Sequence, residues 1–62
     1  MDRLFLQGRV LAETYDRAIE MVIKKIIEKG FAPVKTPRPY PCPVQPVKGM
    51  IWWEYQTEVK EL

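Results

Sequence analysis

Histidine, serine and asparagine are absent from this chain of 62 residues, and cysteine occurs once, as Cys42. Without histidine, the chain lacks a frequent zinc ligand and the commonest general base, so the sequence predicts no metal site. A lone cysteine cannot form a disulfide within the chain, which fits a reducing, cytoplasmic location. Depletion of thermolabile side chains is also a feature of thermophilic proteins, although chance alone can remove a residue type from so short a chain.

Long apolar runs are also missing, and their absence bounds the class of protein. No stretch of about 18 apolar residues occurs, and the first residues, including Asp2 and Arg3, do not follow a signal-peptide pattern. We therefore expect no membrane partner. A chain this short buries about 60% of its unfolded surface, and small domains without disulfides or metals often rely on oligomerisation. The composition predicts one small domain, residues 1–62, that self-associates.

The prolines are concentrated in one stretch that divides the chain. Within residues 37–43, proline alternates with Arg38, Tyr40 and Cys42. Proline fixes its φ at about −65°, has no N–H to donate and pushes the preceding residue towards an extended conformation. No helix or central strand can run through such a segment. We predict a stiff, exposed, proline-rich arm over residues 36–49.

Hydrophobic periodicity places the regular elements on either side of the arm. Alternating apolar residues predict strands over residues 3–13 and 50–61, the second rich in aromatic and β-branched side chains. Residues 15–29 instead repeat apolar side chains at intervals of three and four, which predicts an amphipathic helix. Thr14 offers a hydroxyl to cap its start, and Gly30 suits the left-handed position after its end.

A short extended segment over residues 31–35 follows the helix, and Pro33 limits it to brief pairing or to a sheet edge. The order β-α-β-arm-β predicts an α+β fold, a β-α-β-β unit with one amphipathic helix on a three-stranded antiparallel or mixed sheet. The helix is expected to cover a sheet face made of Leu4, Leu6, Val10, Trp53, Tyr55 and Val59.

The opposite sheet face would then leave three large apolar side chains open to water: Phe5, Leu11 and Trp52. Exposed apolar patches of this kind mark contact surfaces, and most soluble oligomers are made of identical copies. We predict that these three residues form a homo-oligomer interface. The alternative is that the proline-rich arm folds back and covers the face within the same chain.

Charge is unevenly distributed, although the net charge is only +2. Residues 24–48 carry six basic residues and one acidic residue, a balance of +5, whereas the remainder carries four basic and seven acidic residues, a balance of −3. An anionic partner is therefore expected to meet residues 24–48. Ordinary solvated surface charge is the alternative explanation.

One set of aromatic and basic residues has the composition of a binding site: Lys35, Arg38, Tyr40, Lys48 and Trp52. Aromatic rings can stack on a base or a nucleotide while cations bind phosphate. Tryptophan, tyrosine and arginine also supply most of the binding energy at protein interfaces. These five residues are the candidate ligand-binding or partner-binding set.

No catalytic residue is predicted. The sequence holds no histidine that could act as a base for Cys42. Glu54 and Glu58 lie four residues apart on one strand face, about 14 Å from each other, too far to act as a pair. We expect them to lie on a solvated face or on a face that forms cross-strand ion pairs, opposite Arg3 and Arg9. Since no glycine-rich phosphate loop and no Ser-His-Asp set occurs either, the chain is not predicted to be an enzyme.

Two segments resemble a known group of domains. Residues 28–34 close a helix as Glu-x-Gly-aromatic-x-Pro-Val, and residues 55–60 read Tyr-Gln-x-x-Val-Lys. Together they resemble short bacterial and phage domains of unknown function, which have a strand, a helix ending in Glu-Gly-Trp-x-Pro and a closing strand. Phe31 stands where those domains usually have tryptophan. The resemblance implies a β-α-β-β unit able to oligomerise. It does not indicate a chemical activity.

The last strand is also similar to the closing Tyr-Gln-Thr-Glu-Val of dodecins, small flavin-storing proteins of β-α-β-β order. Dodecins stack flavin on a tryptophan within an oligomer. Here Trp52 and Trp53 lie beside the closing motif and not in the middle strand, so the resemblance does not carry over a flavin site. No cofactor is predicted.

These observations together predict a non-enzymatic, oligomeric binding protein that sequesters an anionic small ligand such as a nucleotide. The alternative is a nucleic-acid-binding protein, or a ribonucleoprotein component, that uses the basic proline-rich arm. The expected partners are other copies of the chain, and a nucleotide or nucleic acid bound through residues 24–48. Salt distinguishes the two, because binding to several phosphates weakens steeply as salt rises.

Overall fold

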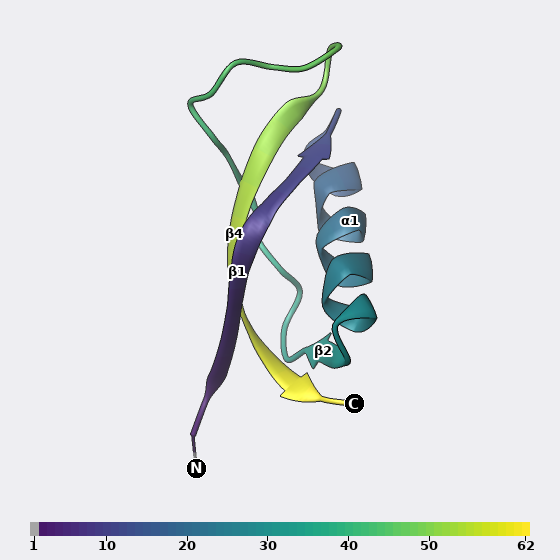
Figure 1. Cartoon of the computed structure of the whole chain (residues 1–62), viewed down its shortest axis with the longest axis vertical. Helices are drawn as coiled ribbons and strands as arrows, with labels where there is room; N and C mark the ends of the chain where they lie inside the picture. Colours follow the sequence, from purple (N-terminus) through teal and green to yellow (C-terminus); the bar gives the residue numbers. More distant parts are fainter. Residues whose placement is uncertain (1) are drawn as a thin grey trace.

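One helix packs against one face of a four-stranded antiparallel sheet in the computed structural model, which describes residues 2–62 (Figure 1). The elements in chain order are β1 (Leu4–Ala12), α1 (Tyr15–Glu28), β2 (Phe31–Pro33), β3 (Tyr40–Pro41) and β4 (Ile51–Glu61). Strand β4 is central, because it pairs with β1 along one side and with β2 and β3 along the other. The predicted α+β fold is confirmed, whereas the three-stranded sheet is wrong because β3 adds a fourth strand.

The ladder between β1 and β4 is the longest pairing in the sheet. It runs from Leu4 opposite Val59 to Ala12 opposite Ile51. Strands β1 and β2 both run antiparallel to β4, so they are parallel to each other with β4 between them. Helix α1 is therefore the crossover between two parallel strands that are not neighbours.

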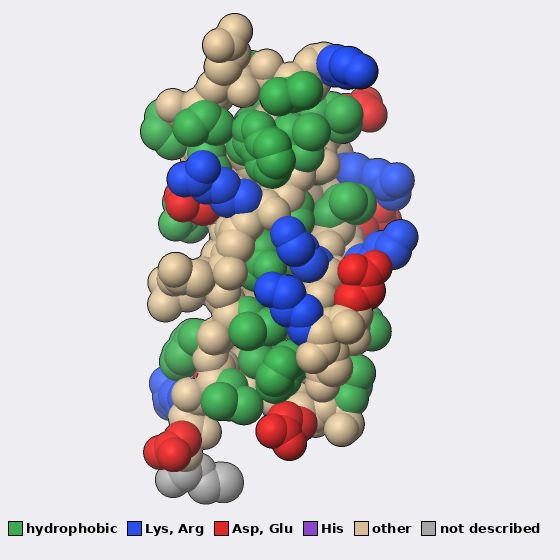
Figure 2. All heavy atoms as spheres, in the orientation of Figure 1, with side chains coloured by type: hydrophobic (Ala, Val, Ile, Leu, Met, Phe, Trp, Pro, Cys, Tyr) green, Lys and Arg blue, Asp and Glu red, His purple; other side chains and the backbone are tan. Residues whose placement is uncertain are grey.

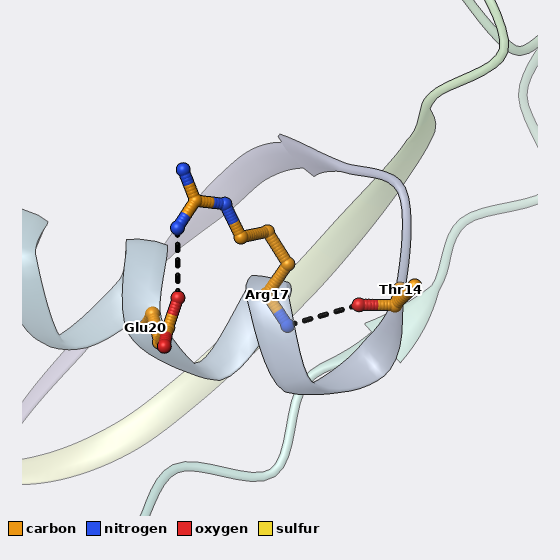
Figure 3. A network of polar contacts seen from close by, with 3 residues as sticks. All are labelled: Thr14, Arg17 and Glu20. Atoms are coloured by element: carbon orange, nitrogen blue, oxygen red, sulfur yellow. Dashed lines mark hydrogen bonds and ion pairs between the residues drawn. The ribbon is translucent and has the colours of Figure 1, made fainter.

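The start of α1 is fixed by local chemistry, which explains why its position was predictable. The Thr14 hydroxyl caps the helix by accepting a hydrogen bond from the Arg17 N–H at 3.2 Å, and the Arg17 guanidinium bonds the Glu20 carboxylate at 2.9 Å (Figure 3). Gly30 takes a left-handed φ of 89° just beyond the helix end. Helix α1 lacks the length and the apolar character needed to cross a membrane.

The core lies between α1 and the sheet face that it covers. Ala18, Val22 and Ile26, four residues apart on one side of α1, are completely buried. Five sheet residues pack with them: Val10, Ala12, Trp53, Tyr55 and Val59. Of the residues predicted for this face, Leu4 remains 44% exposed. It stands at the first position of β1, which extends past the end of α1 (Figure 1).

The proline-rich segment is not the exposed arm that was predicted. Pro37, Pro39 and Cys42 are buried, and β3 pairs with β4 at the edge of the sheet. The Cys42 N–H donates to the Trp52 carbonyl at 2.8 Å. An antiparallel edge strand bonds its neighbour only through alternate residues, so prolines are tolerated at the outward positions between them. The strict alternation with proline is therefore compatible with an edge strand, though not with a central one.

A tight turn joins this segment to β4. The N–H and C=O groups of Val47 and Met50 exchange two hydrogen bonds, each 2.9 Å long. Between them, Lys48 and Gly49 have φ values of 51° and 78°, as the central residues of a two-residue hairpin turn require. Lys48 is thus held at the tip of this turn. The turn lies at one end of the molecule, where the chain enters β4 (Figure 1).

Candidate functional site

The sheet face opposite α1, which we call the open face, carries most of the candidate residues. Strand register places the following side chains on it: Phe5, Gln7, Arg9 and Leu11 from β1; Trp52, Glu54, Gln56 and Glu58 from β4; and Tyr40 and Cys42 from the edge. Helix α1 lies on the other side of the sheet, and the loop from β3 to β4 passes on the open-face side at one end (Figure 1). The described part of the chain therefore covers this face only in part.

The three residues predicted as an oligomer interface fall into two places on the open face. Leu11 stands directly opposite Trp52, and both side chains are partly buried. Phe5 stands opposite Glu58 and is 51% exposed. Six residues of strand separate Phe5 from Leu11, a distance of about 20 Å. Within one chain, the apolar surface is divided into two patches.

The five predicted binding residues do not converge on one site either. Tyr40 stands opposite Glu54 on the open face, 54% exposed and diagonal to Trp52. Lys48 lies at the tip of the turn. Lys35 follows Val34, whose N–H bonds the Glu58 carbonyl. Glu58 and the turn before β4 are eight residues apart along the chain, which corresponds to about 25 Å in a strand. Lys35 and Lys48 are therefore far apart.

Lys35 and Arg38 do share a groove of about 550 Å³ beside β4, lined by Lys35, Thr36, Pro37, Arg38, Gln56, Thr57 and Glu58. Two cations and three neutral polar side chains suit a small anion, while the Glu58 carboxylate opposes one. This groove has a stronger basis for anion binding than Lys48 or Trp52, which lie elsewhere.

The centre of the open face is polar and internally paired. Arg9 stands opposite Glu54, and its guanidinium lies 3.4 Å from the carboxylate. Cross-strand ion pairing, one of the two alternatives predicted for this face, occurs at this position. Glu58 stands opposite Phe5 and not opposite Arg3. A hollow of about 260 Å³ lies over Gly8, lined by Gln7, Arg9, Tyr40, Glu54, Tyr55 and Gln56.

Sequence reasoning did not identify this polar hollow as a site. Gln7, Gln56 and Glu54 are separated along the chain, and register brings them around Arg9. Period-two alternation could place Gln7, Arg9, Glu54 and Gln56 on one sheet face, but the register that brings them together depends on long-range pairing.

Cys42 is buried rather than displayed on an arm, with 6% of its surface exposed. Burial raises the pKa of its thiol above the ordinary value of 9.0, and the Glu54 carboxylate raises it further, while Arg9 acts in the opposite direction. The thiol therefore stays protonated at neutral pH. A protonated, buried thiol is a poor nucleophile, so Cys42 behaves as a small apolar side chain.

Two buried groups that lose a proton at high pH, the Cys42 thiol and the Tyr55 phenol, predict how stability changes there. Burial raises the pKa of both the Cys42 thiol and the Tyr55 phenol above their ordinary values of 9.0 and 10.0. Below those values, both are protonated in the folded and unfolded states. Above about pH 9 the unfolded chain releases protons first, so the free energy of unfolding falls. Urea unfolding at pH 8 and pH 10 measures this loss. Between these two pH values, the free energy of unfolding of the double variant Cys42→Ala/Tyr55→Phe should fall less than that of wild type.

Residues 2–62 contain no cluster of three or more cysteine or acidic side chains that could hold a metal ion. Comparisons of the chain with protein-family models, with curated proteins and with solved structures found no match. The resemblances described above therefore remain predictions. The residues of this chain are the sole basis for the function proposed below.

Proposed function

We propose that this protein is a non-enzymatic interaction protein that works as a homo-oligomer, with its open face as a contact surface for other copies. The observation that carries the proposal is the exposed apolar surface on that face. Phe5 is 51% exposed, and Leu11 and Trp52 lie at the surface beside each other. Burying such side chains contributes about 25 cal/mol for each Å² removed from water.

The proposal includes an anionic small ligand bound by each copy. Within one chain, the candidate binding residues are dispersed, and the best local set is the groove of Lys35 and Arg38. In each copy, Lys35 and Arg38 would hold the phosphate of a molecule such as a nucleotide in this groove. Cofactor chemistry is not part of the proposal, because no residue is placed to act on a bound ligand.

The proposal is tested by measuring oligomeric state. In sedimentation velocity over a range of concentrations, wild type should form a discrete oligomer. Phe5→Gln should weaken its association about tenfold, as expected for losing about 1.4 kcal/mol of apolar burial. Ile27→Gln is a matched control, because Ile27 is 50% exposed but lies on α1, away from the open face.

The same experiment separates the outcomes. A wild-type protein that stays monomeric throughout, or an oligomer weakened equally by both substitutions, contradicts the proposal. Nucleic acid that sediments with the protein and is released by added salt would favour the alternative function, in which Lys35 and Arg38 bind phosphates.

A further inference from the structure

The outer edge of β1 is the longest exposed strand edge in the described part of the chain. Strand β1 pairs with β4 along one side, and residues 2–62 supply no strand for the other side. The carbonyls of Trp52 and Glu58 point towards β3 and β2, so the intervening residues of β4 bond β1. By alternation, four β1 residues direct their N–H and C=O groups outward: Phe5, Gln7, Arg9 and Leu11. Such an edge is a template for another strand.

We propose that two copies of this chain pair through their β1 edges, antiparallel, about a two-fold axis that passes beside Gly8. This pairing joins two four-stranded sheets into one continuous sheet. It rests on the proposed self-association and specifies its geometry. Two-fold symmetry requires that every residue contact be repeated, so the edge must be complementary to itself.

The axis at Gly8 places no edge residue opposite a like charge, and Gly8 stands opposite its own copy. Phe5 stands opposite the partner's Leu11, an apolar pair. Arg3 stands opposite the partner's Glu13, an opposite-charge pair at each end of the ladder. The remaining pairs are Gln7 with Arg9, Leu6 with Val10, and Leu4 with Ala12. Directly opposed apolar or opposite-charge side chains are the pairs that stabilise a sheet.

The neighbouring registers are less favourable. The outward hydrogen-bonding groups and the side-chain faces stay matched only if the partner strand slides by two residues at a time. Each such slide moves the two-fold axis by one residue. Moving the axis one residue forward places Arg9 directly opposite the partner's Arg9. Moving it one residue back places Phe5 opposite Arg9, and moving it two back places Arg3 opposite Arg9. Like charges directly opposite each other destabilise a sheet, which disfavours the axes at Arg9 and at Leu6. The axis at Gln7 opposes no like charges but replaces the apolar partner of Phe5 with Arg9, so the axis at Gly8 is the most complementary of the four.

The pairing unites surfaces that one chain keeps apart. In the joined sheet, Phe5 of one copy lies next to the partner's Leu11. Within the partner, Leu11 lies next to Trp52. The two apolar patches of each open face therefore become two larger patches, each built by both chains. This places all three predicted interface residues in one assembly without a rearrangement of the fold.

The helices leave room for this arrangement. Helix α1 contacts both β1 and β2, which flank the central strand β4, so it lies over the middle of the sheet. With strands about 4.8 Å apart, the two helix axes would be about 14 Å apart, beyond the 8–10 Å of helices in direct contact. The groove beside the edge, about 360 Å³ and lined partly by Met21, Lys24 and Lys25, would face its copy.

Lys25 opposes the pairing and limits its strength. Its ammonium donates to the outward carbonyl of Arg9 at 3.1 Å, and this carbonyl is one that the partner strand would use. Lys and Arg side chains form a band between hydrophobic areas above and below on this side of the molecule (Figure 2). Lysine on an exposed edge is a common guard against pairing. We therefore expect a reversible dimer that tightens in Lys25→Ala.

Charge exchange tests the register without disturbing the core, because Arg3 and Glu13 are both exposed. In sedimentation velocity, Arg3→Glu and Glu13→Arg should each weaken the dimer about tenfold, since each places like charges opposite each other twice. The double variant Arg3→Glu/Glu13→Arg should return to within about twofold of wild type. A double variant as weak as, or weaker than, the single variants overturns the proposed register.

Disulfide trapping distinguishes this geometry from other kinds of self-association. In a Cys42→Ser background, Phe5→Cys/Leu11→Cys should give a covalent dimer on mild oxidation, because paired strands place the Cα atoms about 5.5 Å apart. Within one chain the two positions are about 20 Å apart and cannot bond. The control Gln7→Cys/Leu11→Cys belongs to another register and should stay uncrosslinked. An oligomer that crosslinks both pairs equally, or neither, overturns the edge pairing alone. A monomeric wild type overturns both proposals.

Discussion

Replacing Ile26 with alanine should lower the free energy of unfolding by about 2–5 kcal/mol. The Ile26 side chain is completely buried, between α1 and the sheet, and no shorter side chain can fill its volume. At about 0.05–0.15 kcal/mol for each residue, a chain of this length has a total stability of about 3–9 kcal/mol. The substitution should therefore leave a large fraction of the molecules unfolded near 37 °C.

Urea unfolding followed by tryptophan fluorescence measures this loss, because Trp53 lies in the same core. Protein concentration must be held constant, since self-association adds to apparent stability. Ile27→Ala is the control: the same substitution, one residue along, at a side chain that is 50% exposed. It should change the free energy of unfolding by less than about 1 kcal/mol. Equal losses in the two variants would contradict the placement of the buried stripe of α1.

Gly8→Ala should also destabilise the fold, by about 1–3 kcal/mol, through a clash with one identified side chain. A Cβ at position 8 would lie 2.9 Å from the Tyr55 hydroxyl oxygen and 3.2 Å from its Cζ. The phenol ring thus occupies the space that the glycine leaves, on the helix side of the sheet. Elsewhere, glycine-to-alanine changes compatible with the backbone stabilise by about 0.4–1 kcal/mol through the unfolded state, so a loss here would be diagnostic.

Tyr55→Phe supplies the second half of this experiment. The Tyr55 hydroxyl is buried and has no hydrogen-bond partner within residues 2–62. Removing it should leave stability unchanged or raise it by about 1 kcal/mol. In Gly8→Ala/Tyr55→Phe the closest clash is gone, so the double variant should recover part of the loss. Additive effects in this double-mutant cycle, measured by urea unfolding, would show that the two residues do not compete for the same space.

The elements with strong local signals were predicted almost to the residue. Apolar side chains at helical spacing and the cap at Thr14 defined α1, and alternation defined β1 and β4. Strand β3 was missed because the prolines were interpreted only as residues without an N–H. Their spacing of two also leaves every second residue free to bond a neighbouring strand. That neighbour is β4, which follows later in the chain, so the pairing is a tertiary effect.

The candidate site was less predictable for the same reason. The sequence showed that Phe5, Leu11 and Trp52 share a sheet face, and period-two alternation is enough for that. It did not show that Leu11 and Trp52 are opposite each other, because register depends on long-range pairing. Lys35 and Lys48 were grouped by composition, but the extended path along β4 and the turn at its start hold them far apart.

The two edges of the sheet would respond differently to an incoming strand. On the edge formed by β2 and β3, the outward positions include Pro33, Pro39 and Pro41, none of which has an N–H to offer. A strand that paired with this edge would lack hydrogen-bond donors at the proline positions. The β1 edge, in contrast, presents an N–H group at every outward position. Assembly through strand edges would therefore stop at two copies and could not continue into a fibre. If copies pair through β1 as proposed, these prolines would prevent further strands from adding, so the assembly would stay finite.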